Sequence, residues 1–252
     1  MGILLYHKVD EKLKSVWYVS PDTFKSQMLS LKNKKIVYLD DYNPKDPNHI
    51  VITFDGVYKN ILKYAAPILK ELNYPFELFI TGDYVGKDNS FDTPEPLEYF
   101  ANEDELKEFV KMGGRLQWHT NTHRKFDENM SLSDVEKEMQ IPENLKLLDT
   151  KGFTWFAYPH GDLTQDKVNI VKKYFKGALS CYQGNNYDLY MLDRIMVFEN
   201  TILKENKTKK FIQNIFSIKN GYENNIKYKI LGIKFNFRNQ NLAQTGMAVE
   251  RE

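Results

Sequence analysis

The sequence of 252 residues contains a single cysteine, Cys181, which excludes an internal disulfide and is typical of a protein from a reducing compartment. It has no run near the ~18 apolar residues that a membrane span requires. The amino terminus lacks both the positive charge and the apolar core of a signal peptide. We therefore expect a soluble, cytoplasmic protein without a transmembrane segment.

An excess of charge of either sign is also lacking. Lys and Arg total 35 and Asp and Glu total 34, so there is no electrostatic reason to expect nucleic acid as a partner. We find no internal repeats. Hydrophobic residues make up 42% of the chain, which is enough to bury the core of one large α/β domain.

Short apolar segments alternate with longer amphipathic ones up to about residue 200. The expected strands are 3–6, 35–39, 51–55, 76–81, 115–118, 153–157, 177–181 and 189–197. The expected helices are 21–33, 58–72, 103–112, one that begins at 131, and 165–175. This alternation indicates parallel βαβ units, and hence a closed or nearly closed barrel or a doubly wound sheet.

The composition changes after residue 199. From Glu199 to Arg238 there are nine Lys and Arg but only three Glu. Residues 226–237 are typical of an edge strand or a hairpin arm, and the composition of residues 240–252 favours disorder. We therefore divide the chain into a main domain, residues 1–217, and a basic extension or linker, residues 218–252, with a further domain possible beyond it.

Polar side chains stand where two of the expected strands end. Asp55 follows the apolar residues 51–54, and side chains at the carboxyl ends of parallel strands line ligand sites. The alternative is that Asp55 caps the next helix. His119 and His123 follow another expected strand, and two imidazoles at this spacing suit one divalent ion such as Zn²⁺. Their alternative is a pair of exposed loop histidines.

Five short motifs, in order along the chain, resemble those of a known family. They are residues 4–9 (LLYHKV), 53–58 (TFDGVY), 119–123 (HTNTH), 156–161 (FAYPHG) and 192–195 (LDRI). Over about residues 3–200 the chain thereby resembles the polysaccharide deacetylases, the NodB-homology domain of carbohydrate esterase family 4.

The resemblance implies a distorted (β/α)7 barrel of the NodB-homology type, with a short carboxy-terminal extension and its site at the carboxyl ends of the strands. It also implies a metal-dependent hydrolase that removes an acyl group, such as acetyl, from an N-acylated amino sugar in surface-glycan or polysaccharide metabolism. In that scheme Asp55 is the general base, His7 is the general acid, and Arg194 orients Asp55.

The same resemblance suggests the metal ligands and the substrate groove. His119 and His123 hold the divalent metal, with zinc expected, and Asp55 is a further candidate ligand. The residues expected to line the substrate groove are Trp118, Tyr158, Pro159, His160 and Gly161. His160 stands where relatives more often have Tyr, so its imidazole could replace a missing ligand; the alternative is a role in backbone geometry.

One position departs from the family pattern. The second acid of the first motif, usually the third protein ligand to the metal, is Gly56 in this chain. Restoring the acid with Gly56→Asp is therefore expected to tighten metal binding. Two other functions stay open: a catalytically silent domain that binds glycan or acts as a scaffold, and a metal-independent amide hydrolase on the same fold.

Overall fold

The computed structural model describes residues 2–181, 188–203, 227–230 and 233–236. The expected domain boundary at residues 217 and 218, and the expected disorder of residues 240–252, lie outside these ranges. In the described part of the chain, no helix has the length and apolar character needed to cross a membrane.

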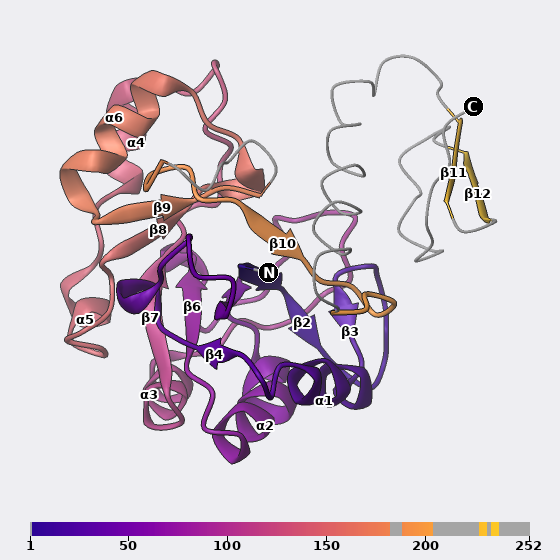
Figure 1. Cartoon of the computed structure of the whole chain (residues 1–252). Helices are drawn as coiled ribbons and strands as arrows, with labels where there is room; N and C mark the ends of the chain where they lie inside the picture. Colours follow the sequence, from indigo (N-terminus) through magenta and orange to yellow (C-terminus); the bar gives the residue numbers. More distant parts are fainter. Residues whose placement is uncertain (1, 182–187, 204–226, 231–232, 237–252) are drawn as a thin grey trace.

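Seven strands form a nearly closed parallel sheet, which confirms the expected barrel (Figure 1). Their order is β10 (Arg194–Met196), β1 (Ile3–Tyr6), β5 (His49–Asp55), β6 (Phe76–Ile80), β7 (Gly114–Trp118), β8 (Trp155–Ala157) and β9 (Gly177–Leu179). All neighbours along this path are parallel. Between β9 and β10 there is one isolated parallel bridge, which joins Leu179 to Leu192.

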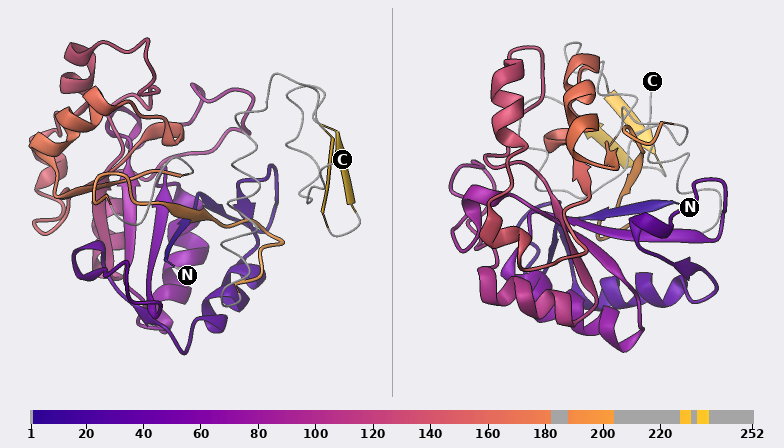
Figure 2. Two further views of the ribbon diagram at one scale, coloured as in Figure 1. Left: turned by 45° about the horizontal axis from the view of Figure 1, so that its top comes forward. Right: turned by 90° about the vertical axis from the view of Figure 1, so that its left-hand side faces the viewer.

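Helices connect the strands and cover the outside of the sheet (Figure 2). They are α1 (Pro21–Ser30), α2 (Ala66–Glu71), α3 (Glu103–Lys111), α4 (Leu132–Glu138), α5 (Glu143–Lys146) and α6 (Gln165–Tyr174). Helices α4 and α6 pack against each other, apart from α1, α2 and α3 (Figure 1). Short 3-10 turns occur at Leu39–Asp41, Gly82–Tyr84 and Pro159–Gly161.

Three further strand pairs accompany the barrel. Strand β4 (Lys35–Ile36) extends the sheet beside β5, and β2 (Lys8–Val9) pairs in parallel with β3 (Tyr18–Val19). Strands β11 (Lys227–Ile230) and β12 (Ile233–Asn236) form an antiparallel pair. Of the two expectations for residues 226–237, an edge strand or a hairpin arm, this antiparallel pair agrees with the second.

The helix starts follow local capping signals. The side chain of Ser20 accepts a hydrogen bond from the first turn of α1, and Pro21 occupies the first helical position. Asn102 and Glu105 form a reciprocal capping box at the start of α3. Ser131 caps α4 in the same way as Ser20 caps α1. Because these signals are local, the sequence was sufficient to find all three starts.

The expected helix 58–72 is confirmed over residues 59–71, although its first half is not a regular α-helix. A π-helical turn at Ile61–Ala65 precedes α2, which begins at Ala66. Pro67 explains the difference, because proline has no N–H to donate to the fourth residue before it and its ring clashes with that carbonyl group. A wider turn accommodates the missing hydrogen bond.

Several expected strands are shorter than predicted. The strand expected at 35–39 ends at Ile36, and the strand expected at 189–197 is reduced to Arg194–Met196. The strand expected to begin at residue 153 begins at Trp155, because Phe153 has a left-handed φ of 56° that breaks the extended backbone.

Two hydrophobic layers hold the barrel. The larger lies between sheet and helices and includes Phe54, Leu78 and Phe109. The smaller fills the barrel and includes Val51, Phe79 and others, namely Ile3, Trp155, Ala157, Leu179 and Leu192. Since side chains alternate along a strand, residues two apart from these interior positions also face inward.

One carboxylate, that of Glu77, lies inside the barrel, two residues before Phe79 and fully buried. It accepts hydrogen bonds from the backbone N–H of Leu39 at 2.7 Å and from the side-chain amide of Gln117 at 2.8 Å. The side-chain oxygen of Gln117 in turn accepts a hydrogen bond from the backbone N–H of Trp155. Burial raises the pKa of Glu77 to about 7, although both hydrogen bonds favour the ionised form.

Glu77 should therefore make stability depend on pH. Its pKa is raised from 4.5 in the unfolded chain to about 7, so its contribution is complete below pH 4.5 and is lost as pH rises through 7. The loss is at most about 3 kcal/mol. Urea unfolding of wild type and Glu77→Gln at pH 5 and pH 8 should show the variant losing less stability between the two. An equal loss in both proteins, or the same flattening in the exposed control Glu128→Gln, would contradict this assignment.

Candidate active site

Asp55 is the last residue of β5, at the carboxyl end of the barrel interior. Val51, Thr53 and Asp55 face the same side because they are two residues apart, and Val51 belongs to the interior cluster. The carboxylate therefore ends an inward-facing column of side chains, where it is only 4% exposed.

Arg194, the first residue of β10, binds Asp55 through two parallel hydrogen bonds. Nη1 donates to Oδ1 at 2.7 Å and Nη2 donates to Oδ2 at 2.6 Å. The guanidinium also donates through Nε to the carbonyl oxygen of Ser180 at 3.1 Å. Arg194 is 2% exposed, which excludes a surface ion pair, and the carboxylate of Asp55 faces Arg194 instead of capping the next helix.

The charges of this pair stabilise each other. Burial by itself raises the pKa of Asp55, but the guanidinium of Arg194 and the ring of His119 outweigh it and hold that pKa well below its usual range. Burial also disfavours the charged form of Arg194, yet Asp55 raises the pKa of the guanidinium above its ordinary value. Asp55 is therefore ionised and held in one orientation at neutral pH.

His119 directly follows β7 and points toward Asp55. Its Nδ1 lies 2.7 Å from the carbonyl oxygen of Ala157, which can only accept, so Nδ1 carries the proton. Its Nε2 then has a free lone pair and lies 3.8 Å from Oδ2 of Asp55. A histidine held in this way by a backbone carbonyl is typical of metal ligands.

The imidazole rings of His123 and His160 lie close to that of His119, one after the other. The ring centre of His123 lies 4.9 Å from that of His119 and 4.8 Å from that of His160. Burial lowers the pKa of His119, and burial together with the neighbouring imidazoles lowers the pKa of His123 well below its usual value. Both rings are therefore neutral at pH 7, which is the form that binds metals.

These residues satisfy only part of a metal site. His119 and His123 are suited to fill two coordination positions of a metal ion. Both oxygens of Asp55, however, are bound by Arg194, and residue 56 is a glycine without a side chain. Within the described ranges, no three His, Cys, Asp or Glu side chains are grouped so that they could hold one ion. The donor set is thus a pair of imidazoles with a carboxylate beside it.

His7 immediately follows β1 and packs on Trp17, with ring centres 4.7 Å apart. Burial lowers the pKa of His7 to about 3, and the negative charge of Asp55 opposes this only in part. His7 is therefore neutral at pH 7. Trp17 was not among the predicted site residues, because it lies in a loop without a periodic pattern.

The residues expected to line the substrate groove differ in exposure. Trp118 and Tyr158 are fully buried, and their polar atoms donate to the carbonyl oxygens of Glu138 and Tyr190. Pro159 and Gly161 are buried as well. Only His160 is exposed, with a left-handed φ of 57°. The others support the wall of the site from behind, and the structure does not place them at its surface.

Two aromatic side chains that the sequence analysis did not predict, Phe91 and Tyr84, lie beside His123. Phe91 lies 5.7 Å from the His123 ring and is stacked on Tyr84 at 3.9 Å. The loop that carries Phe91 is tied to the residue after His7, because the fully buried Lys8 binds Glu95 at 2.9 Å. The sequence predicted only a long loop in this region.

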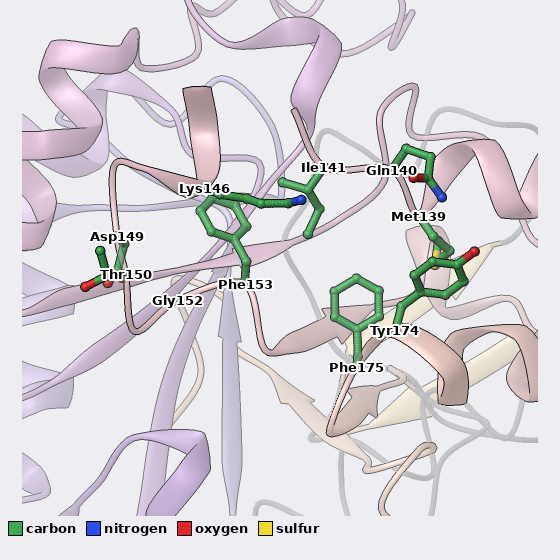
Figure 3. A pocket seen from close by; sticks show the side chains of 10 residues that line it. All are labelled: Met139, Gln140, Ile141, Lys146, Asp149, Thr150, Gly152, Phe153, Tyr174 and Phe175. Carbon is green, nitrogen blue, oxygen red and sulfur yellow. The ribbon is translucent and has the colours of Figure 1, made fainter. Parts of the chain in front are cut away.

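A hollow of about 450 Å³ lies elsewhere in the fold (Figure 3). Its walls include Phe153 and Phe175, which precede β8 and β9, and the charged side chains of Lys146 and Asp149. It therefore lies near the amino-terminal ends of these strands, whereas Asp55 and His119 stand at carboxyl ends. None of the residues expected in the site lines it.

The chain was compared with known proteins. A family model described as polysaccharide deacetylase matches residues 42–175, just over half of the chain. The poly-beta-1,6-N-acetyl-D-glucosamine N-deacetylase of Staphylococcus aureus (strain MRSA252) is 29% identical over 175 residues, which cover 62% of this chain and 58% of that relative. The chain thus spans less than two thirds of the length of this relative.

Solved structures share the fold. A polysaccharide deacetylase from Bacillus cereus has a TM-score of 0.65 at 24% identity, over 79% of this chain and 65% of that one. The deacetylase PplD of Streptococcus pyogenes, solved in complex with acetate, has a TM-score of 0.65 at 19% identity, over 79% and 93% of the two chains. At such identities the likeness shows the barrel alone. Together with the family match, it means that this chain belongs to the polysaccharide deacetylase family.

Proposed function

We propose that this protein hydrolyses the N-acetyl amide of an amino sugar within a glycan. The observation that carries the proposal is the buried Asp55–Arg194 pair, with His119 at 3.8 Å from its carboxylate. The family match and the named activity of the Staphylococcus aureus relative support a polymer of β-1,6-linked N-acetylglucosamine as the substrate class.

Each residue has a role in this proposal. Asp55 is ionised and held by two hydrogen bonds, so it accepts a proton from the attacking water in a fixed direction. The same pairing makes it a weak base, because a low pKa reduces proton affinity. His7 is neutral at pH 7, so it must first take up a proton from solvent before it can donate one to the departing amine. The carboxylate of Asp55 is the neighbour that favours this charged form.

His119 and His123 would hold a divalent cation, with zinc expected. When bound, the cation supplies Lewis-acid activation of the amide carbonyl and of water. The Ala157 carbonyl keeps Nε2 of His119 free for this purpose. The ring centre of His160 lies 4.8 Å from that of His123, so His160 is a further imidazole beside this pair.

A second candidate function follows from the incomplete donor set. Residue 56 is a glycine and both carboxylate oxygens of Asp55 are bound by Arg194, so neither residue supplies a further metal ligand. A barrel of this kind could bind glycan without hydrolysing it. A third candidate, metal-independent amide hydrolysis, would use the same Asp55 and His7 without the two histidines. Substrate assays separate all three candidates.

The proposed activity is tested with oligomers of β-1,6-linked N-acetylglucosamine, by measuring acetate release and free amine. Asp55→Asn should lower the rate about 10²-fold or more, because the amide cannot accept the proton. The control Asp83→Asn changes an exposed carboxylate in the loop after β6 and should leave the rate unchanged.

The outcomes of this assay differ for each candidate. If the wild-type protein binds the oligomer but releases no acetate even with added zinc, its function is glycan binding without hydrolysis. Activity that survives a chelator would favour the metal-independent hydrolase. Full activity of Asp55→Asn would show that Asp55 is not the base.

The backbone at Gly56 does not suit the acid that the family pattern places there. Gly56 has a φ of 64°, in the left-handed region that favours glycine. A Cβ added at this position would lie 2.9 Å from the ring of Tyr58 and 3.1 Å from that of Phe100. In contrast to the expectation from the sequence, we therefore expect that Gly56→Asp does not tighten metal binding.

Gly56→Asp should destabilise the protein by about 1 kcal/mol or more without tightening zinc binding. Thermal unfolding and zinc calorimetry measure the two effects. The matched control is Gly113→Ala, since Gly113 has a φ of 95° but nothing near an added Cβ, so it reports the backbone cost alone. A Gly56→Asp protein with unchanged stability and tighter zinc binding would show that the loop adapts to the acid.

A further inference from the structure

The loop between His119 and His123 has an unfavourable backbone. Thr120 has a φ of 73° and His123 a φ of 60°, and both are non-glycine residues in the left-handed region. Such conformations cost free energy and persist only where surrounding contacts fix them. The directions of the His119 and His123 rings depend on this bend, because it lies between them.

Glu138, the last residue of α4, binds this loop from outside. Its Oε2 accepts the backbone N–H of Asn121 at 2.7 Å and that of Thr122 at 2.9 Å. Its Oε1 accepts the hydroxyl of Thr122. The carboxylate is 5% exposed, so these three donors replace water for a charged group in the protein interior.

The same residue also holds the strand before the loop. The backbone carbonyl of Glu138 accepts the indole N–H of Trp118 at 2.7 Å, and Trp118 directly precedes His119. Glu138 therefore binds the chain on both sides of His119. On the far side, the loop carbonyls of Thr120 and Asn121 accept the N–H groups of Gly82 and Asp83. The bend is thus held between α4 and the loop after β6.

We propose that Glu138 is the positioning residue of this site: its carboxylate holds the bend that sets the directions of His119 and His123. The inference deepens the proposed function, on which the metal role of these two rings rests. The hydrogen bonds of the Glu138 side chain go to the loop and not to the rings, so we infer that it acts through the loop. The opposing view is that Glu138 stabilises the fold as any buried, hydrogen-bonded carboxylate would.

Four variants separate the two views. Glu138→Ala removes all side-chain contacts to the loop. Glu138→Gln keeps an oxygen for the two N–H groups and an amide that can donate to the hydroxyl of Thr122, so it should restore the geometry. Val135→Ala leaves a cavity under the same helix and lowers stability without touching the loop. Glu136→Ala removes contacts between α4 and α6, namely those to Lys173 and Tyr174.

The first measurement is NMR of the imidazole signals in the metal-free protein, where the chain has only five histidines to assign. Glu138→Ala should shift or broaden the signals of His119 and His123, and Glu138→Gln should restore them. Val135→Ala and Glu136→Ala should leave them in place. The proposal is overturned if Glu138→Ala leaves both signals unchanged, or if Val135→Ala moves them equally.

The second measurement is zinc affinity by calorimetry on the same proteins. We expect at least a tenfold loss in Glu138→Ala and less than a threefold change in Glu138→Gln, with both controls near wild type. Equal affinity of wild type and Glu138→Ala would overturn the positioning role. The NMR measurement needs neither metal nor substrate, so it tests the role of Glu138 independently of activity. A lack of deacetylase activity would refute the proposed function but would not decide the role of Glu138.

Discussion

The buried ion pair between Asp55 and Arg194 is the interaction on which the site depends. It joins the last residue of β5 to the first residue of β10. These two strands flank β1 on either side, so the pair ties three neighbouring strands together. Removing either partner would leave an unpaired charge in the interior, which costs far more than the pair itself contributes. The pair therefore fixes both the ionisation and the direction of the candidate base.

Three different backbone contacts support the groups around this pair. The carbonyl of Ser180 holds the guanidinium of Arg194, and the carbonyl of Ala157 fixes the tautomer of His119. Glu138 binds the N–H groups of the loop that ends at His123. The contacts come from Ser180 directly after β9, from Ala157 in β8 and from Glu138 in α4, so the site is rigid only when the whole barrel is assembled.

The sequence predicted the parts of this structure that depend on local chemistry. Capping residues located the helix starts, and apolar runs that end on Asp55, His7 and His119 located one edge of the barrel. The pairing of Asp55 with Arg194 was expected only from the family resemblance, and the role of Glu138 was not predicted at all, because the spacing of a carboxylate in the sequence does not identify its partner. The full burial of Trp118 and Tyr158 was not predictable for the same reason. The catalytic roles, the domain boundary and the cytoplasmic location stay predictions.

The separation of Asp55 and Arg194 along the chain also bears on how the protein folds. The two residues are 139 positions apart, and four strands of the barrel, β6 to β9, lie between them in the chain. Contacts of such long range form late and slow the folding of a domain. During synthesis, a barrel that already contains β1 and β5 to β9 still has the carboxylate of Asp55 without its counter-charge. The charge that defines the site is neutralised only when the last strand docks beside the first, so assembly of the site and completion of folding are the same event.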